Sequence, residues 1–385
     1  MLKKASAVTQ YNSTKDVIDA VAPDNPSFLY SRERVRIAAG AFTEGFNGLL
    51  TYAVKANPAP HLVRDLAEFG VGAWDVASPN EMEALTAIHP GAVMHYNNPV
   101  RSLREIVRAH EEFGIRSYSI DHPSQLASIA KIVPASRETE ITVRFKAGKS
   151  RKAFDFGSKF GATEPEAVAL AKDAWARGYG VSFCFHVGSQ CEVPYAYERH
   201  IAAAGRIATE AGVTLERLNI GGGFPAAYPT SVAPPIEYYT RAINRAVQAT
   251  FGANKPLLIA EPGRFLAAPS TAVLLRVKHR RNNKAVYVND GFYGALMELK
   301  FMNVLPPVRV WRNGEVVGGD MLPFVIFGPT CDSYDSLPRQ LDLPADIQVD
   351  DWVELGLMGA YSQASTTNFN GFSDRDQYFV TDILG

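Results

Sequence analysis

Short apolar runs alternate with amphipathic stretches from about residue 26 to about residue 265. The runs are rich in β-branched and aromatic residues, as in FLYS (28–31), LLTYAVK (49–55) and ITVRF (141–145). Between them lie segments such as PAPHLVRDLAEFG (58–70), whose apolar residues recur at every third and fourth position, as on one face of a helix. Strand and helix thus alternate along this part of the chain, which predicts a β/α fold.

Eight or nine such units in about 240 residues favour a closed (β/α)8 barrel, with an open doubly wound sheet as the alternative. After about residue 270 the pattern changes to strand-like runs separated by turn residues, as in AVLLRVKHRR (272–281) and LPFVIFG (322–328). Asn313-Gly314 between two such runs is typical of a hairpin turn. The sequence therefore predicts a barrel over 26–268 and a C-terminal β domain formed by 1–25 and 269–385.

Charge and composition exclude several classes of protein. Lys and Arg number 39 against 40 Asp and Glu, for a net charge of −1, whereas a general nucleic-acid binder is usually basic. No apolar run reaches the length of about 18 residues that a membrane-spanning helix needs, and MLKKASAVTQ lacks an apolar signal core. The three cysteines have neither disulfide-framework nor metal-site spacing. We expect a cytoplasmic protein that binds neither nucleic acid nor membrane.

Function in a β/α barrel collects where the strands end, which gives candidate residues. Lys55 ends LLTYAVK; burial there would lower its pKa and favour a neutral amine able to form a Schiff base, although a strand-end lysine also commonly extends to solvent. His186 ends VSFCFHVG and could stack on a ligand or donate a proton, or simply be a satisfied core histidine. No second histidine lies at ligand spacing, so we expect no metal.

Two further strand ends suggest a site for an anionic ligand. Gly221-Gly222-Gly223 follows LNI, and three glycines allow backbone N–H groups to approach a phosphate, with Ser189 as a possible donor. Glu261 and Arg264 in EPGR could serve two ends of a ligand or pair with each other. Cys331 and Tyr361, later in the chain, are further candidates for the site, and the alternative for each is a side chain that only packs in the structure.

Eight motifs occur in an order that resembles one family: YAVKANPAP, WDVASPNE, SKFGA, FHVGSQ, NIGGGFP, EPGR, GPTCDSYD and MGAY. The chain resembles, from about residue 25 to 375, the fold type III, alanine-racemase-like amino-acid decarboxylases that use pyridoxal 5'-phosphate (PLP). Ornithine and lysine decarboxylases are the most similar branch, and diaminopimelate decarboxylase is more distant. The resemblance implies a PLP-binding barrel, a C-terminal β domain and a homodimer whose active sites are shared between subunits.

The resemblance also implies roles for individual residues. Lys55 matches the lysine bonded to PLP, His186 the histidine stacked on its ring, and Glu261 the acid at the ring nitrogen. Cys331 matches the cysteine that is linked to correct protonation of the product carbanion, and Asp332 the acid that is linked to the substrate's distal amine, both donated by the partner subunit. Other positions match residues that surround the ring or hold the phosphate: Asp75, Glu81, Arg144, Ser189, Gly222, Gly223, Gly263, Arg264 and Tyr361.

Glu261 favours decarboxylation over racemisation. Loss of CO₂ from the substrate's Schiff base leaves an electron pair on Cα, which a protonated pyridine ring accepts. A carboxylate at the ring nitrogen keeps that nitrogen protonated, whereas racemases of this fold usually place an arginine there. The retained Lys55, His186, Glu261 and Cys331 also oppose a non-enzymatic regulator of the antizyme-inhibitor type.

One departure affects the expected substrate. Ornithine decarboxylases carry a second acid after the segment NDGFYG (289–294), and here that position falls at or beside Phe301-Met302. Glu298 is the nearest acid, so Glu298, Met302 and Asp332 are the expected substrate-binding residues. We expect decarboxylation of ornithine or lysine to a diamine. Another amino acid, a carboxylated polyamine or racemisation are the alternatives.

Overall fold

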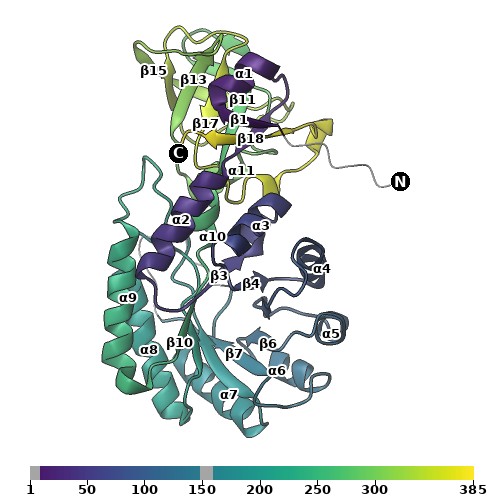
Figure 1. The fold of residues 1–385 in the computed structure, drawn as a ribbon, viewed down its shortest axis with the longest axis vertical. Coiled ribbons are helices and arrows are strands. Elements are labelled where there is room, and N and C mark those ends of the chain that lie inside the picture. The colour runs from purple at the N-terminus through teal and green to yellow at the C-terminus, as the bar shows by residue number, and fades with distance from the viewer. Residues whose placement is uncertain (1–8, 148–158) are drawn as a thin grey trace. The chain divides into compact units, whose positions relative to one another are not determined.

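The computed structural model describes residues 9–147 and 159–385, and the chain divides into two compact units (Figure 1). The barrel unit comprises Ala39–Pro225 and Val232–Arg264. The sheet unit comprises the residues up to Ala38 together with Ala226–Ser231 and Phe265–Gly385. Two predicted features extend outside the described residues: the first eight residues of the segment 1–25, and Ser158 of the motif SKFGA.

Eight parallel strands close the barrel in the order β10-β3-β4-β5-β6-β7-β8-β9, which confirms the predicted fold class. The strands are β3 (Leu49–Ala53), β4 (Ala73–Val76), β5 (Met94–Tyr96), β6 (Ser117–Ile120), β7 (Glu140–Arg144), β8 (Gly180–Cys184), β9 (Arg217–Asn219) and β10 (Leu257–Ala260). Most of their residues are buried on both sides, as expected when side chains fill the barrel and helices cover it.

The helices of the barrel unit surround the strands in Figure 1. α9, for example, buries Ile236, Tyr239 and Ile243 along one face and leaves Tyr238 and Arg241 exposed on another. The helices are α2 (Arg32–Gly45), which crosses the unit boundary, α3 (Pro60–Glu68), α4 (Pro79–Ile88), α5 (Leu103–Val107), α6 (Pro123–Ala130), α7 (Glu164–Ala176), α8 (Tyr195–Ala211) and α9 (Ile236–Phe251), with the short turns η1 (Val54–Ala56), η2 (Arg108–Glu112) and η3 (Gly252–Asn254).

The sheet unit is built on ten strands in the order β1-β18-β2-β11-β12-β15-β16, with β17 paired to β11 and β13, and β14 paired to β13. They are β1 (Gln10–Ser13), β2 (Ser27–Tyr30), β11 (Thr271–Arg281), β12 (Ala285–Val288), β13 (Val308–Arg312), β14 (Glu315–Val316), β15 (Met321–Phe327), β16 (Leu341–Pro344), β17 (Trp352–Leu355) and β18 (Asp376–Asp382). The helical segments are α1 (Thr14–Val21), α10 (Gly263–Ala267), which starts in the barrel unit, η4 (Ala268–Ser270), α11 (Met297–Met302), η5 (Gln363–Ser365) and η6 (Phe369–Gly371).

The predicted hairpin is confirmed, and one predicted barrel strand is reassigned. β13 and β14 are antiparallel, and Asn313 and Gly314 between them have φ of 50° and 75°, as a tight turn requires. The FLYS run, expected to begin the barrel, forms β2 instead, which pairs with β11 and β18 in the sheet unit. A buried four-residue apolar strand reads the same in either sheet, so periodicity could not distinguish them.

The core of the sheet unit joins the two ends of the chain. Val17, Leu29 and Val380 are buried in one cluster with Trp311 and Trp352. Glu354, fully buried among them, accepts hydrogen bonds from Thr14 Oγ1, Trp311 Nε1 and the backbone N–H of Leu384. These three donors satisfy a carboxylate that would otherwise be costly to bury.

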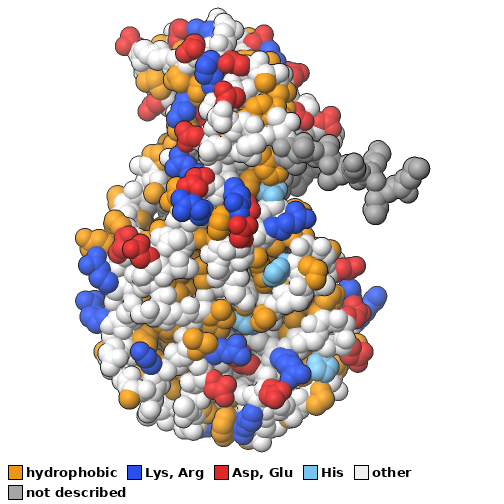
Figure 2. Space-filling view, in the orientation of Figure 1, with side chains coloured by type: hydrophobic (Ala, Val, Ile, Leu, Met, Phe, Trp, Pro, Cys, Tyr) orange, Lys and Arg blue, Asp and Glu red, His pale blue; other side chains and the backbone are white. Residues whose placement is uncertain are grey.

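Basic and acidic side chains are interspersed on the face shown in Figure 2, consistent with the near-zero net charge. Within residues 9–147 and 159–385, no helix combines the length and the apolar character needed to cross a membrane.

Candidate active site

The carboxyl ends of the barrel strands place the residues with reactive side chains at one rim. All eight strands are parallel, so the residues that end or follow them share one end of the barrel. They are Lys55 in η1 after β3, Asp75 on β4, Asn97 after β5, Arg144 on β7, His186 after β8, Asn219 on β9 and Glu261 after β10.

Lys55 is paired with a buried acid and is not itself buried. Its Nζ lies 3.5 Å from Oδ2 of Asp75, whose side chain is only 5% exposed, whereas 55% of the Lys55 side chain is accessible. Of the two alternatives for Lys55, the structure shows the accessible side chain, because the lysine extends from the short η1 turn and not from the strand. An accessible amine at the rim is suitably placed to react with an aldehyde.

Glu261 is held by two amides. The Nδ2 atoms of Asn97 and Asn219 donate to the same carboxylate oxygen, Oε1, over 2.7 and 2.5 Å. Burial, reinforced by the negative charge of Asp75, raises the pKa of Glu261 to about 7. The group can therefore hold or release a proton near neutral pH.

His186 is neutral. Burial, together with the positive charges of Arg144 and Lys55, lowers the pKa of His186 to about 3. Its Nδ1 accepts a hydrogen bond from the backbone N–H of Gly188 over 3.0 Å, which assigns the remaining ring proton to Nε2. A neutral ring in a fixed orientation suits stacking against another flat ring.

The glycine loop after β9 packs closely against the backbone of the segments that follow β8 and β10. Gly221 and Gly223 have φ of 67° and 99°, and a Cβ on either would come within 2.4 Å of a carbonyl oxygen, of Phe185 and Gly188 respectively. Only glycine fits these positions. A Cβ on Gly222 would lie 2.7 Å from the Glu261 carbonyl oxygen, so this loop passes directly beside the Glu261 strand end.

A buried guanidinium lies in the same unit. Arg264 is 6% exposed, and its Nε and Nη2 both lie 3.3 Å from Ser189 Oγ, to which they donate. Gly263 comes before it, where a Cβ would already touch Ala56 at 3.1 Å. Glycine backbone, a buried cation and a hydroxyl form a donor set that fits a phosphate, and Lys55 and Glu261 fit an aldehyde and a ring nitrogen. The residues of this rim therefore fit PLP.

Two other expected ring neighbours have structural contacts. The Glu81 carboxylate accepts a hydrogen bond from Ala77 N–H over 2.6 Å, and the Glu81 N–H donates to Oγ of Ser78, the N-cap residue of α4. The guanidinium of Arg144 lies 5.1 Å from the ring centroid of Phe160. Its charge contributes to the lowered pKa of His186.

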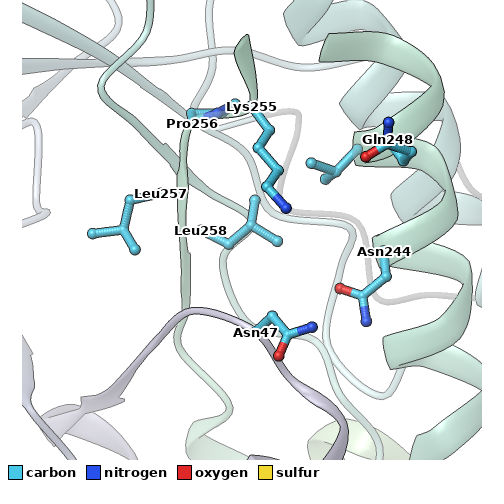
Figure 3. A pocket seen from close by; sticks show the side chains of 8 residues that line it. Asn47, Asn244, Gln248, Lys255, Pro256, Leu257 and Leu258 are labelled. Atoms are coloured by element: carbon cyan, nitrogen blue, oxygen red, sulfur yellow. The ribbon is translucent and has the colours of Figure 1, made fainter. Parts of the chain in front are cut away.

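A separate hollow lies at the other end of β10. It has a volume of about 380 Å³ and is lined by Leu257 and Leu258 and by polar residues including Asn47, Asn244 and Lys255 (Figure 3). Leu257 begins β10 and Glu261 follows its end, so the hollow is not part of the rim described above.

Cys331 and Asp332 lie in the sheet unit, in the loop after β15. Cys331 is exposed, and its Sγ lies 3.4 Å from Asn370 Oδ1. Asp332 accepts a hydrogen bond from Tyr334 N–H at Oδ1 and another from Tyr293 O–H at Oδ2. Both hydrogen bonds lower the pKa of Asp332, and the one from Tyr293 has the larger effect. The loop thus presents a thiol beside a carboxylate that remains ionised.

Buried Asp335 determines the shape of this loop. It accepts hydrogen bonds from Phe292 N–H and from both the N–H and the Oγ1 of Thr330, over 2.7 to 3.0 Å. A Cβ on Gly291 or Gly328 would come within 2.2 Å of the same carboxylate. The last residue of GPTCDSYD is therefore a structural acid beneath Cys331 and Asp332.

α11 brings a cation near Asp332. Lys300 Nζ donates to the Tyr334 carbonyl oxygen over 2.6 Å and lies 3.4 Å from the centroid of the Tyr334 ring. Burial lowers the pKa of Lys300, while the negative charges of Asp335 and, after it, Asp332 act in the opposite direction. Glu298 and Met302 are half-buried on the same helix. Their predicted contact with substrate stays a prediction.

Tyr361 follows β17 with a φ of 60°, a conformation that is uncommon outside glycine, asparagine and aspartate. Its carbonyl oxygen accepts a hydrogen bond from Ser365 Oγ. Its predicted role as a phosphate donor stays a prediction.

Four residues of these sites are not predicted by the sequence pattern: Asn97, Asn219, Tyr293 and Lys300. Asn97 and Asn219 lie at strand ends, so the rule that found Lys55 could have found them. Neutral amides carry no titratable chemistry of their own, so a search for reactive side chains passes over them.

The barrel and the sheet match separate family models. Residues 32–268 match the pyridoxal binding domain of pyridoxal-dependent decarboxylases, and residues 269–359 match their C-terminal sheet domain. The chain belongs to the pyridoxal-dependent decarboxylase family. The cofactor of this decarboxylase is accordingly PLP. The chain is similar, with 30% identity and a TM-score of 0.85 over 95% of this chain and 94% of the other, to a solved structure of an SrLDC mutant in complex with PLP.

Relatives of this decarboxylase differ in what they act on. The chain is 32% identical to the lysine/ornithine decarboxylase of Selenomonas ruminantium over 83% of this chain and 80% of the other. It is 26% identical to the arginine decarboxylase of Paramecium bursaria Chlorella virus bound to agmatine, with a TM-score of 0.85, over 94% and 98%. It is also 29% identical to antizyme inhibitor 2 of Xenopus laevis over 86% and 75%. The family is thus established, whereas relatives at similar distances bear different names.

Proposed function

We propose that this decarboxylase converts a basic L-amino acid, ornithine or lysine, to a diamine. The observation that carries the proposal is Asp332, an ionised carboxylate positioned by Tyr293 and Tyr334 beside the exposed thiol of Cys331. A carboxylate with two neutral donors keeps its charge and can pair with a substrate's distal ammonium. The names of the lysine, ornithine and arginine decarboxylases among the relatives support the same class of substrate.

The rim residues would hold the cofactor. Lys55 would bond to it through Nζ, while Gly222, Gly223, Gly263, Arg264 and Ser189 hold its phosphate, with Tyr361 as a further donor. When bound, PLP supplies an electron sink for the pair left on the substrate's Cα as CO₂ departs. His186, neutral and fixed through Nδ1, would stack on the ring without adding a positive charge.

Glu261 would keep a proton at the pyridine nitrogen. Burial raises its pKa to about 7, and a cationic ring nitrogen beside the carboxylate would favour the ionised form. Asp75, paired with Lys55, would keep the lysine amine oriented toward the reacting carbon. Arg144 would balance the negative charges of the two acids.

Cys331 and Asp332 would act in the active site of a partner subunit in a homodimer. Cys331 would give a proton to the product carbon after CO₂ loss, and Asp332 would bind the distal amine. The position expected to carry a second acid falls at or beside Phe301-Met302, so that amine would have Asp332 as its single carboxylate partner. Glu298, about one helical turn earlier, is the acid on α11.

A second candidate is decarboxylation of an amino acid whose distal end carries no ammonium. The position of Lys300 favours this second candidate. Its ammonium group lies over the Tyr334 ring and interacts electrostatically with Asp332, and a cation there would disfavour a second cation at the distal end of the substrate. A carboxylated polyamine is the remaining substrate alternative.

A substrate panel tests the proposal. CO₂ release would be measured with L-ornithine, L-lysine, L-arginine, a carboxylated polyamine and L-norleucine, which resembles lysine without its amine. We expect the highest kcat/KM with ornithine or lysine. Activity confined to norleucine would refute the diamine product and support the second candidate. Chiral analysis of recovered substrate detects racemisation, and a colourless protein that cannot be reconstituted with PLP would indicate a non-enzymatic regulator.

A further inference from the structure

Two asparagines from opposite sides of the barrel converge on one oxygen atom. Asn97 follows β5 and Asn219 ends β9, and these strands are separated by β6, β7 and β8 in the closed sheet. Both Nδ2 atoms donate to Oε1 of Glu261, over 2.7 and 2.5 Å. We call these residues the amide pair. Oε1 therefore has two donors, and Oε2 is the oxygen that is left for a ligand.

Each amide is fixed in the donating orientation by a donor behind it. The Ser119 hydroxyl donates to Asn97 Oδ1 over 3.0 Å, and the Gly221 N–H donates to Asn219 Oδ1 over 2.8 Å. A flipped amide would turn its oxygen toward the carboxylate and its NH₂ group toward another donor. Both amides are therefore locked with NH₂ groups facing Glu261.

The donor chain continues into the barrel. Ser119 is fully buried, and its Oγ lies 3.7 Å from Cys184 Sγ. Burial raises the pKa of the Cys184 thiol, so the thiol keeps its proton and can donate to Ser119. Cys184, Ser119 and Asn97 thus form a chain of hydrogen-bond donors that ends at Glu261. In this chain the buried Cys184 thiol has Ser119 as its partner.

We infer that the amide pair positions Glu261 for its partner on the cofactor ring: it occupies Oε1, keeps the carboxylate ionised and directs Oε2 to the ring nitrogen. The inference rests on the proposed role of Glu261. Two charge-assisted hydrogen bonds oppose the effects that favour protonation, namely burial and the negative charge of Asp75. The charged groups Lys55 and Arg144 also face Glu261 and favour its ionised form.

Asn97 is the better site for a test. Asn219 also accepts from the Gly221 N–H, so changing it would disturb the phosphate loop as well. Asn97→Ala removes one donor to Glu261 and leaves that loop intact. Asn98→Ala is the matched control, because Asn98 is the adjacent residue, equally half-buried, but its Nδ2 donates to the Ala77 carbonyl oxygen.

The first readout is cofactor affinity, measured by fluorescence titration of the apo protein. It would use PLP and an analogue in which C–H replaces the ring nitrogen. We expect Asn97→Ala to weaken PLP binding by about tenfold to a hundredfold, the usual effect of one hydrogen bond to a charged group, and to leave the analogue's affinity within about twofold. Asn98→Ala should leave both affinities within about twofold of wild type. Equal weakening of PLP and analogue by Asn97→Ala, or no weakening, would overturn the inference.

The second readout is kinetic. Asn97→Ala should lower kcat by a similar factor with little change in KM for the amino acid, and should shift the acidic limb of the kcat profile to higher pH, because the carboxylate then protonates more readily. Ser119→Ala, which only frees the Asn97 amide to flip, should show a smaller effect of the same kind, and serves if Asn97→Ala does not fold. An unshifted acidic limb in both variants would contradict the inference. If the wild type were inactive on every amino acid, the proposed function would fail, and the PLP-to-analogue affinity ratio would still test the amide pair.

Discussion

Replacing Glu261 by glutamine should stabilise the apo protein above neutral pH while it abolishes most activity. The folded chain raises the pKa of Glu261 from 4.5 to about 7, so the folded state binds a proton between these values that the unfolded state releases. Stability therefore falls as pH rises through this window. A pKa difference of this size corresponds to roughly 3 kcal/mol, fully expressed above about pH 7.

The geometry makes glutamine a close substitute for the protonated acid. The side-chain amide oxygen of the introduced glutamine can accept from both Asn97 and Asn219, as Oε1 of Glu261 does, and its NH₂ group then takes the place of Oε2. At about pH 5, where the folded Glu261 is mostly protonated, the two proteins should differ little. At about pH 8.5 the variant should be more stable by about 1.5 to 2.5 kcal/mol, after a reduction for the partly accessible carboxylate.

The assay is urea denaturation of both apo proteins at about pH 5 and about pH 8.5. Glu210→Gln, an exposed substitution on α8, is the control and should change stability equally at the two pH values. Activity of the reconstituted Glu261→Gln protein should fall at least tenfold, because an NH₂ group at Oε2 cannot accept the ring nitrogen's proton. A stability difference between variant and wild type that is the same at both pH values would refute the reasoning about Glu261.

Four further outcomes are expected. Cys331→Ala should retain PLP binding, measured by absorbance, and lose most turnover; full turnover would disprove its role. Inactive Lys55→Ala and Cys331→Ala proteins, when mixed, should regain partial activity through hybrid dimers if sites are shared, and no recovery would count against sharing. Lys300→Met should raise kcat/KM for ornithine or lysine up to about fivefold by removing a like charge, whereas a decrease would make Lys300 a substrate ligand. Arg375→Ala should destabilise the protein by about 3 kcal/mol in urea, because it removes the cationic partner of Asp290, which is 3% exposed and keeps two backbone N–H donors; a loss below about 1 kcal/mol would contradict this.

Much of the fold could be predicted because its signals are local. The barrel strands that end at Lys55, Arg144 and His186 are apolar runs bounded by amphipathic helices, and Asn313-Gly314 specifies its own turn geometry. The sequence pattern places FLYS in the wrong sheet because the partners of this strand, β11 and β18, lie more than two hundred residues away in the sequence. Pairing at such a distance depends on the whole fold.

The candidate site divides in the same way. Strand ends can be recognised from the sequence, so Lys55 and Glu261 follow as soon as the barrel is inferred. The exposure of Lys55 depends on the turn after β3. The hydrogen bonds that position Glu261 come from Asn97 and Asn219, which lie at the ends of two other strands. These are properties of three-dimensional proximity. The sequence indicates that an acid is missing near Met302, but not that Lys300 turns toward Tyr334.

The pairing of the chain's two ends in the sheet unit has a consequence for how the protein is made. β1 and β2 both pair with β18, and Oε1 of buried Glu354 accepts hydrogen bonds from both Thr14 and Leu384, near the two ends of the chain. During synthesis the first strands leave the ribosome long before residues 376–382 exist, whereas every strand of the barrel has been made by residue 260. The barrel can fold cotranslationally, and β2 can pair with β11 once residue 281 is made, but β1 and the second edge of β2 remain unpaired until β18 is complete. Loss of β18, as by premature termination, would therefore leave a folded barrel attached to an aggregation-prone, incomplete sheet.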